Sequence, residues 1–226
     1  MKILNLYAGI GGNRKGWKLE PGDEVTAVEI DENIANIYIY NFPQDKMVIG
    51  DAHEYLLKNF KKFDFIWSSP PCPTHSRVRK SLAFKKKKDG TIFEQNKPCY
   101  PDMKLYQEII LLDNYFEGKY CIENVMGYYD PLIIPQILGR HYFWANFLIP
   151  NIKLESRGNF DESIKMAEKM GFDLSNFKKV NTMRVLRNCV EPEISEKIFE
   201  AMKNKNGSQL CIFDYDELKG SEKNER

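Results

Sequence analysis

The sequence predicts an α/β fold that is doubly wound around a mostly parallel sheet. Short apolar runs of strand length alternate with amphipathic runs of helix length, and a polar or glycine-containing stretch follows each apolar run. Alternating strands and helices form βαβ units, whose right-handed crossovers place the strands parallel in one sheet. Such sheets bind ligands at the carboxyl ends of their strands, which is where the polar stretches of this chain lie.

Five segments are expected to contain strands: KILNLYAGIGG, EVTAVEID, MVIGDA, FDFIWSSPPC and KYCIENV. Helical patterns follow or precede them at residues 34–40, 55–60 and 103–115. Two more helices are expected late in the chain: DESIKMAEKMGF, capped by Asp161 or Ser163, and EPEISEKIFEAMKN, with Pro192 in its first turn. Residues 77–101 are polar and basic, and are expected to form a long mobile loop.

Composition limits the classes of protein to which the chain can belong. With 226 residues, of which 42% are hydrophobic, one domain with a substantial core is expected. No apolar run has the length of a membrane span, and the five cysteines form no CxxC pair. We therefore expect no membrane association, no metal site and a reducing cytoplasm. Because the net charge is only +1, positive charge for binding nucleic acid would have to be local.

A glycine turn and two acids suggest a nucleoside site. Tyr7 to Gly12, YAGIGG, follows the first strand; its glycines permit positive φ and a close approach of ligand, although a tight strand-to-helix turn explains them equally well. Glu29 ends the second strand about twenty residues later, where a carboxylate can accept hydrogen bonds from a ribose diol. Asp51 ends the third strand and would accept from an adenine amine or cap the next helix, and Asp31 is expected to be a cap or solvated.

The stretch SSPPCPTHS contains a candidate nucleophile. Cys72 follows a strand, and the neighbouring prolines restrict the backbone around it. A thiol at the edge of a cleft near cations can have a lowered pKa and attack as a thiolate, whereas the alternative is a small apolar core residue. His75 would lower that pKa or cap the following turn. Glu123 ends the fifth strand and would act as a proton donor or remain a surface acid, with Asn124 fixing the loop.

Taken together, these motifs resemble one known family. NLYAGIGG, VEID, GDA, SSPPCPTHS and ENV occur in this order, and the set resembles the cytosine-5 DNA methyltransferases. LGRHYFWANF is similar to the family's arginine-bearing strand, with Arg140 at the arginine. RNCVEPEISEKI is similar to the family's last motif, with Arg187 in place of a glycine and Asn188 as the asparagine. The resemblance extends roughly from residue 3 to residue 200.

The resemblance implies a Rossmann-like methyltransferase fold that uses S-adenosylmethionine. It implies that Cys72 adds to ring carbon 6 of a cytosine flipped out of duplex DNA, that Glu123 holds ring nitrogen 3 and the amine, and that Arg140 holds the ring carbonyl. The cofactor-binding residues that it implies are Tyr7, Ala8, Gly9, Gly11, Gly12, Glu29, Ile30, Asp51, Ala52, Pro70, Asn188 and Cys189.

The chain also departs from the family pattern. Pro73, Thr74 and His75 stand where the family usually continues with glutamine. The expected catalytic domain is 1–146 with 187–210, which leaves only 147–186 as a reduced recognition segment and 211–226 as a tail. A protein partner or a dimer could supply the missing recognition. The basic loop is expected to bind DNA phosphates or to be simply solvated; its candidate residues are Ser76, Arg77, Arg79, Lys80, Lys85, Lys86, Lys87 and Lys88.

The expected function is therefore methylation of carbon 5 of cytosine in DNA, in the cytoplasm of a bacterial or phage-infected cell and of restriction-modification type. Two alternatives stay open: a methyltransferase acting on RNA cytosine, and a catalytically silent relative that binds DNA or cofactor. His53 and His141 show no partner pattern and are expected to be structural, whereas Trp67, Trp144 and Tyr142 are expected in the core.

Overall fold

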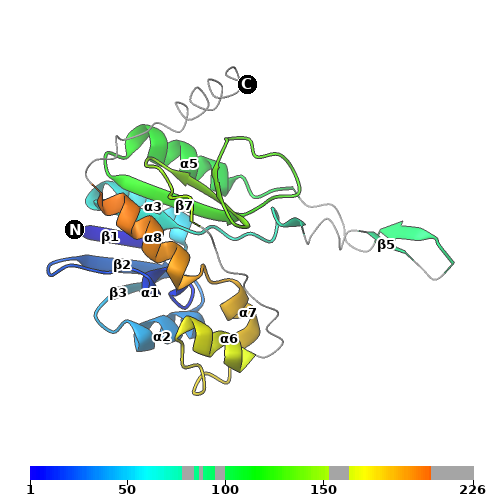
Figure 1. Ribbon diagram of the computed structural model, residues 1–226, viewed down its shortest axis with the longest axis horizontal. Helices are drawn as coiled ribbons and strands as arrows, with labels where there is room; N and C mark the ends of the chain where they lie inside the picture. Colours follow the sequence, from blue (N-terminus) through cyan, green and yellow to red (C-terminus); the bar gives the residue numbers. More distant parts are fainter. Residues whose placement is uncertain (78–83, 87–88, 95–99, 153–162, 205–226) are drawn as a thin grey trace.

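The computed structural model describes residues 1–77, 84–86, 89–94, 100–152 and 163–204. Its centre is a seven-stranded sheet with the order β3-β2-β1-β4-β7-β9-β8 (Figure 1). The first five of these strands are parallel neighbours, whereas β9 pairs antiparallel with both β7 and β8. The predicted doubly wound α/β fold is confirmed. The strands are β1 Lys2–Leu6, β2 Glu24–Glu29, β3 Lys46–Ile49, β4 Phe65–Ser68, β7 Lys119–Val125, β8 Gln136–Leu138 and β9 His141–Ala145.

Helices cover both faces of this sheet. Successive strand side chains point to opposite faces, so Ile3 packs with α8, whereas its neighbour Leu4 packs with α3 and α5. Both faces are apolar because both are covered, as is usual for parallel strands. A third cluster joins α2, α6 and α7 beside β2. The helices are α1 Gly12–Lys15, α2 Glu32–Asn41, α3 Ala52–Asn59, the 3-10 helix η1 Phe60–Lys62, α5 Lys104–Tyr115, α6 Ser163–Met170, α7 Thr182–Arg187 and α8 Pro192–Lys203.

Aromatic side chains fill the core between the sheet and α8. Trp17 stacks on Phe199 with ring centroids 5.3 Å apart, and Trp67 lies 6.0 Å from Trp17. Trp67 and Trp144 are buried, as predicted, whereas Tyr142 is only half-buried. Such rings bury large apolar areas, and their packing fixes α8 on the sheet.

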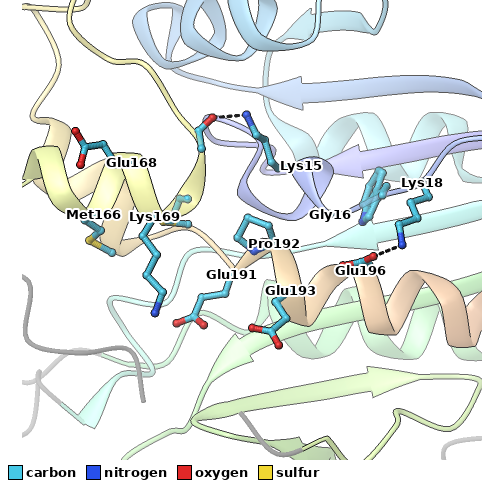
Figure 2. A pocket seen from close by; sticks show the side chains of 13 residues that line it. Lys15, Gly16, Lys18, Met166, Glu168, Lys169, Glu191, Pro192, Glu193 and Glu196 are labelled. Atoms are coloured by element: carbon cyan, nitrogen blue, oxygen red, sulfur yellow. Dashed lines mark hydrogen bonds and ion pairs between the residues drawn. The ribbon is translucent and has the colours of Figure 1, made fainter. Parts of the chain in front are cut away.

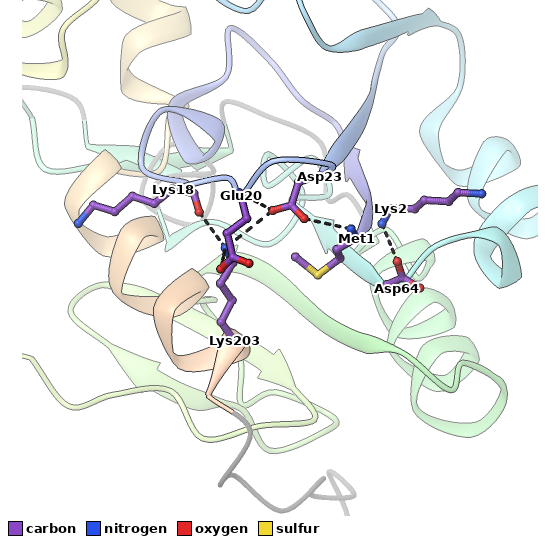
Figure 3. Close-up of polar contacts among 7 residues, drawn as sticks. All are labelled: Met1, Lys2, Lys18, Glu20, Asp23, Asp64 and Lys203. Carbon is purple, nitrogen blue, oxygen red and sulfur yellow. Dashed lines mark hydrogen bonds and ion pairs between the residues drawn. The ribbon is translucent and has the colours of Figure 1, made fainter.

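Polar contacts fasten the amino end of the sheet (Figure 3). The Met1 ammonium lies 3.0 Å from Asp23, and Lys203 near the end of α8 lies 3.0 Å from Glu20. The Lys2 amide donates to Asp64 just before β4, at 2.6 Å. These polar contacts therefore stabilise the end of the sheet that lies opposite to the strand ends where ligands are expected.

The order of the strands fixes the position of the ligand site. From β1 the chain proceeds to β2 and β3 on one side, and it then returns to β4 and β7 on the other side. The crevice between the carboxyl ends of β1 and β4 is therefore the topological switch point, where open α/β sheets bind ligands. The glycine turn follows β1 and the Pro-Pro-Cys stretch follows β4, so both border this crevice.

The prediction of a structureless loop at residues 77–101 is wrong for its described parts. β5 (Phe84–Lys86) and β6 (Ile92–Glu94) form an antiparallel hairpin that projects from the body of the molecule (Figure 1). Gly90 in its turn has φ 91°, and the Thr91 amide donates to Asp89 at 2.8 Å. Asp89-Gly90 is a local sequence signal for a hairpin, and the prediction of a loop did not take it into account. Among the described helices, none is long and apolar enough to span a membrane.

Candidate active site

The glycine turn has an unusual backbone. Tyr7 is the one non-glycine residue of the described chain with positive φ, at 55°, and Gly9 and Gly11 have φ of 56° and 90°. A Cβ on Gly11 would lie 2.3 Å from the Phe42 ring. One on Gly12 would lie 2.5 Å from the Cβ of Cys189. Packing alone therefore requires the last two glycines, whereas Gly9 faces open space, with no atom within 4 Å of a built Cβ.

Glu29 ties the glycine turn to the end of β2. Its Oε2 accepts from the Gly9 amide at 2.9 Å, and its Oε1 accepts from the amides of Ile30 and Asp31, both at 3.0 Å. A carboxylate has about four lone-pair positions, so three donors leave one open. The open position is on Oε2, because Oε1 already has two donors. Glu29 can therefore hold the turn and still accept from a ligand hydroxyl.

A pocket of about 140 Å³ lies at the carboxyl ends of β1, β2 and β3. Its lining includes half of the predicted cofactor-binding residues, namely Tyr7, Glu29, Ile30, Asp51, Ala52 and Pro70. The other lining residues were not predicted from the sequence, namely Gly50, Pro71, His75, Asp102, Lys104 and Leu105. The predicted residues outside this lining are Ala8, Gly9, Gly11, Gly12, Asn188 and Cys189.

Asp51 takes the capping role and also contacts a lysine. It caps α3 by accepting from the Glu54 amide at 3.0 Å, and its other oxygen lies 3.6 Å from Lys104. The hydrogen bond from the Glu54 amide is the main cause that lowers the pKa of Asp51, so the carboxyl stays ionised at the rim of the pocket. Asp31 caps α2, as predicted.

The segment between α7 and α8 packs beneath the glycine turn. Cys189 is buried, and its thiol donates to the Val185 carbonyl at 3.2 Å. Asn188 ends α7 with its side chain exposed. Ala8 is also buried, so Ala8 and Cys189 contribute to the site as packing, whereas Asn188 has a free side chain.

A buried carboxylate that the sequence analysis missed lies behind the pocket. Glu108 of α5 is fully buried, yet it accepts from Tyr7 Oη at 2.6 Å and from Ser68 Oγ at 2.7 Å. Nδ1 of His53 lies 3.0 Å from the same carboxylate, so His53 has a partner after all. Burial and Glu108 together raise the pKa of Tyr7, so this hydroxyl stays protonated and donating. Glu108 thus connects the glycine turn with the end of β4.

Cys72 lies in a tight turn directly after Pro70 and Pro71. The amides of His75 and Ser76 close this turn on the Cys72 carbonyl, at 2.9 and 3.0 Å. Nδ2 of Asn124 donates to the Pro70 carbonyl at 3.1 Å, which confirms that Asn124 fixes the loop. The pairing of Ser68 with Ile122 puts this turn beside Glu123.

The expected lowering of the thiol pKa is wrong for this structure. Burial, and then the nearby Glu123 carboxylate, raise the pKa of Cys72. His75 does not act on the thiol as a cation. Its Nδ1 lies 2.6 Å from Tyr129 Oη, and burial lowers its own pKa. The Tyr128 amide donates to the His75 carbonyl at 3.1 Å, so His75 joins the turn of Cys72 to the segment after β7.

The residues of the arginine-bearing strand differ from the expected arrangement. Arg140 lies in the turn just before β9, with its side chain exposed and its carbonyl accepting from the Met126 amide at 3.2 Å. Its neighbour His141, expected to be structural, has Nδ1 2.6 Å from Oε1 of Glu123. The antiparallel pairing of β7 with β9, which the sequence analysis did not predict, brings this histidine to Glu123.

Comparisons with known proteins point to one family of enzymes. A protein-family model described as "C-5 cytosine-specific DNA methylase" matches residues 1–97. A tRNA (cytosine(38)-C(5))-methyltransferase of Spodoptera frugiperda is 27% identical over 217 residues, which cover 87% of this chain and 61% of that protein. The Type II methyltransferase M.Bsp6I of a Bacillus species is 25% identical over 187 residues, covering 80% of this chain and 55% of the relative. These matches support a member of the cytosine-C5 methyltransferase family.

The chain spans little more than half the length of the two relatives just named. A solved structure, that of the Spodoptera frugiperda DNMT2 E260A/E261A/K263A mutant, is 27% identical to it. That comparison covers 56% of this chain and 36% of the other, with a TM-score of 0.36.

The cofactor of the family is S-adenosylmethionine, and the pocket beside the glycine turn suits it. Carboxylates stand at the ends of the adjacent strands β2 and β3, where a ribose and an adenine amine need acceptors. Ile30 lines the pocket although its side chain is 69% exposed, so an apolar surface is available to a base. The acceptors and the apolar wall of this pocket therefore fit the adenosine part of the cofactor.

A larger cavity, of about 480 Å³, lies between α1, α6 and α8 (Figure 2). Lysine and glutamate side chains surround it, and two contacts tie its walls together: Lys15 donates to the Gly171 carbonyl, and Lys18 pairs with Glu196. None of the predicted catalytic or cofactor-binding residues lines it. This cavity is therefore separate from the candidate active site.

The predicted DNA-binding residues are only partly described. Ser76 is half-buried and forms an isolated antiparallel β-bridge with Gly127. Nε of Arg77 donates to the Gly127 carbonyl at 3.0 Å. Lys85 and Lys86 belong to β5, of which the structure describes the backbone. The remaining members, Arg79, Lys80, Lys87 and Lys88, lie outside the described residues.

Proposed function

We propose that this chain transfers a methyl group to carbon 5 of a cytosine in DNA. The observation that carries the proposal is the position of Cys72, whose turn after β4 lies beside Glu123 of the adjacent strand β7. The two groups are close enough for Glu123 to raise the pKa of the thiol. A pocket suited to a nucleoside lies against the same Pro-Pro-Cys loop, because Pro70 and Pro71 line it. A nucleophile, a proton donor and a cofactor pocket thus share one edge of the sheet.

The cofactor would be held by groups with separate tasks. Glu29 would accept from the ribose through Oε2, and Asp51 would accept from the adenine amine. Ile30 and Pro70 would pack against the adenine ring. The glycine turn would lie along the remainder, with Asn188 nearby as the family motif implies. When bound, S-adenosylmethionine supplies the methyl group that carbon 5 of the cytosine accepts.

The protein would activate the base by covalent addition. The Cys72 thiolate forms a bond from Sγ to carbon 6, and the electrons of the carbon 5–carbon 6 double bond move into the ring. Nitrogen 3 takes a proton from Glu123, which leaves a neutral enamine with a nucleophilic carbon 5. Arg140 would hold the ring carbonyl oxygen, where charge also develops. After methylation, the carbon 5 proton would pass to solvent water, and the electrons of its bond re-form the carbon 5–carbon 6 double bond as the sulfur–carbon bond breaks. This step restores the ring and the thiolate, and nitrogen 3 returns its proton to Glu123.

The target base would have to leave the DNA duplex. Carbon 6 of a stacked cytosine is out of reach of a thiol in a protein cleft, so the nucleotide must be extruded at a cost of a few kcal/mol. The basic loop after Cys72 would offset part of this cost by contacting phosphates. Residues 147–186 remain the proposed recognition segment, and 1–146 with 187–210 the proposed catalytic domain. A partner protein or a second copy of the chain would add recognition.

RNA is the second candidate substrate, and one observation favours it. The Spodoptera frugiperda relative, whose match covers 87% of this chain, is by name a tRNA methyltransferase. The family description that matches residues 1–97 names DNA instead. The proposed chemistry at Cys72 and Glu123 is the same for both, because the reacting ring is the same.

Transfer of labelled methyl groups tests the proposal. The full chain is incubated with S-adenosylmethionine labelled in the methyl group and with duplex DNA, single-stranded DNA or tRNA in parallel. We expect label in 5-methylcytosine of DNA, complete loss of transfer in Cys72→Ser, and retained cofactor binding in that variant. Cys121→Ser, which alters a buried thiol of β7, is the control and should keep transfer. Label confined to tRNA would contradict the choice of DNA, and absence of label from all three would contradict the proposed reaction.

A further inference from the structure

The carboxylate proposed as the proton donor has a histidine partner. Nδ1 of His141 lies 2.6 Å from Oε1 of Glu123, and the side chains are 19% and 9% exposed. In the antiparallel pairing of β7 with β9, Val125 faces His141 and Glu123 faces Phe143. His141 and Glu123 therefore lie diagonally across the two strands, within reach of each other. Both strands are regular, so the pair is held by the sheet and not by a mobile loop.

The contact determines which atoms remain for a substrate. A carboxylate only accepts hydrogen bonds, so Nδ1 of His141 must carry the proton in this contact. Oε1 of Glu123 is occupied by it, and Oε2 has no hydrogen-bond partner among the described residues. The histidine therefore selects the oxygen that faces a base. It also orients that oxygen, because a hydrogen bond to Oε1 fixes the rotation of the carboxyl group.

The other ionisable groups around this contact do not replace His141 as the partner of Glu123. The other ionisable groups near the pair are the thiols of Cys72 and Cys121 and the side chain of Arg140, in the turn before β9. The Glu123 carboxylate raises the pKa of both thiols. Arg140 is exposed, so within the described chain His141 is the donor in contact with Glu123. Charge-assisted hydrogen bonds of this kind are shorter and stronger than neutral ones, and more so away from water.

We propose that His141 is a positioning residue for Glu123, an inference that rests on the proposed function. Its Nδ1–H holds the carboxyl group with Oε2 toward nitrogen 3 of the flipped base. When Glu123 gives its proton to nitrogen 3, the same Nδ1–H stabilises the carboxylate that remains. When the proton returns from the product to Glu123, Nδ1 keeps its own proton throughout. No proton is therefore lost from the pair over one turnover.

Substitutions that place a hydrogen-bond donor at different positions of the former imidazole ring test this role. His141→Asn puts an amide nitrogen near the place of Nδ1, His141→Gln puts one near the place of Nε2, and His141→Ala removes the donor. The readout is the single-turnover rate at which the full chain forms a covalent adduct with DNA containing 5-fluorocytosine, in the presence of S-adenosylmethionine. We expect a rate about 10- to 100-fold lower for Ala and Gln, and close to wild type for Asn.

Controls separate positioning from folding. Tyr142→Phe changes the next residue of β9, whose side chain points to the other face of the strand, and should keep the wild-type rate. Cofactor affinity should stay unchanged in all variants, because His141 does not line the pocket. Equal rates in wild type, Ala, Gln and Asn would overturn the proposal. Equal losses in all three variants, with lowered melting temperatures, would also overturn it and assign a purely structural role.

A second readout needs no substrate. The rate at which iodoacetamide alkylates Cys72 is followed against pH, with the other cysteines accounted for by peptide mapping. Loss of the Nδ1–H leaves the Glu123 carboxylate uncompensated beside the thiolate, so His141→Ala should move the alkylation midpoint to higher pH, and His141→Asn should not. If the wild type forms no adduct with DNA or RNA, the proposed function fails. The alkylation shift then decides alone whether His141 acts on Glu123, and an unchanged midpoint overturns the inference.

Discussion

Cys72 is placed where two effects act against its thiolate. It is partly buried, which disfavours a charged sulfur, and the Glu123 carboxylate adds repulsion. A thiol placed in this way resists oxidation and alkylation, because the thiolate is the reactive form. Protonating Glu123 as the base binds would remove the repulsion, so the carboxyl group that assists the addition would also release the nucleophile.

The repulsion between Glu123 and Cys72 can be measured in the free protein. Replacing Glu123 by glutamine removes a negative charge next to the sulfur, so the thiolate becomes easier to form and the pKa of Cys72 falls. We expect the pH midpoint of Cys72 alkylation to move downward in Glu123→Gln. Mass spectrometry of the Cys72 peptide after timed iodoacetamide treatment gives the rate at each pH. An unchanged midpoint would show that the two groups do not interact.

His75 should make the stability of the protein depend on pH. Burial lowers its folded-state pKa below the ordinary value of about 6.5, so between the two values the unfolded chain binds more protons. The free energy of unfolding should therefore fall as pH drops below about 6.5, and the contribution of His75 is intact above that value.

Urea unfolding at a series of pH values tests the contribution of His75. His75→Asn keeps a polar group for Tyr129 but cannot titrate, so its stability should change less between neutral and mildly acid pH than that of the wild type. Parallel curves for the two proteins would rule out His75 as the source of the pH dependence.

At the scale of the elements, α5 does more than cover the sheet. Glu108 interrupts the apolar face of this helix, yet it is fully buried and serves three donors from the glycine turn, β4 and α3. A buried charge is tolerated only when it is hydrogen-bonded in this way. Tyr7 has the positive φ typical of strained functional positions, and its hydrogen bond to Glu108 helps to hold it there.

Replacing Glu108 by leucine should therefore be costly. The change leaves the buried hydroxyls of Tyr7 and Ser68 without an acceptor, so the free energy of unfolding should fall by about 3 kcal/mol. Gln107→Leu, at an exposed position of the same helix, should stay within about 0.5 kcal/mol of the wild type. Chemical denaturation of the two variants gives both numbers. A loss of less than about 1 kcal/mol in Glu108→Leu would contradict the assigned role.

The sequence was informative where elements have local signals. The five parallel strands and the polar residues at their carboxyl ends could be predicted, because each strand has its own apolar run and each site residue follows directly. The pairing of β9 with β7 depends on contacts far apart in the chain, so the approach of His141 to Glu123 could not be anticipated. Glu108 was missed for the same reason, because its donors come from three other elements. The β5–β6 hairpin had a local signal, Asp89-Gly90, directly after a run of lysines.

Over the whole molecule, charge is nearly balanced, and any affinity for nucleic acid must come from a local cluster. The net charge is +1, while Lys85, Lys86, Lys87 and Lys88 are consecutive. Lysines that contact phosphates release counterions. The logarithm of the binding constant therefore falls with the logarithm of the salt concentration, with a slope of about 0.9 per contact. If the four lysines bind phosphates, neutralising them should weaken binding to all sequences alike and reduce the salt dependence.

The salt dependence gives a matched comparison. The chain with all four lysines changed to glutamine should lose about 3 to 4 from the slope of log K against log salt. Lys61→Gln with Lys62→Gln, in η1 before β4 and so at the opposite end of the sheet, should leave the slope unchanged. Fluorescence anisotropy with a labelled duplex provides both slopes. Equal slopes in the two variants would exclude the basic run as the DNA contact.

The most direct test of the account is to locate the covalent bond. DNA containing 5-fluorocytosine is incubated with the full chain and S-adenosylmethionine, the adduct is digested, and the modified peptide is sequenced by mass spectrometry. We expect a nucleotide attached to Cys72, and no adduct in Cys72→Ser. Attachment to Cys121 or Cys189, or an adduct that survives in Cys72→Ser, would contradict it.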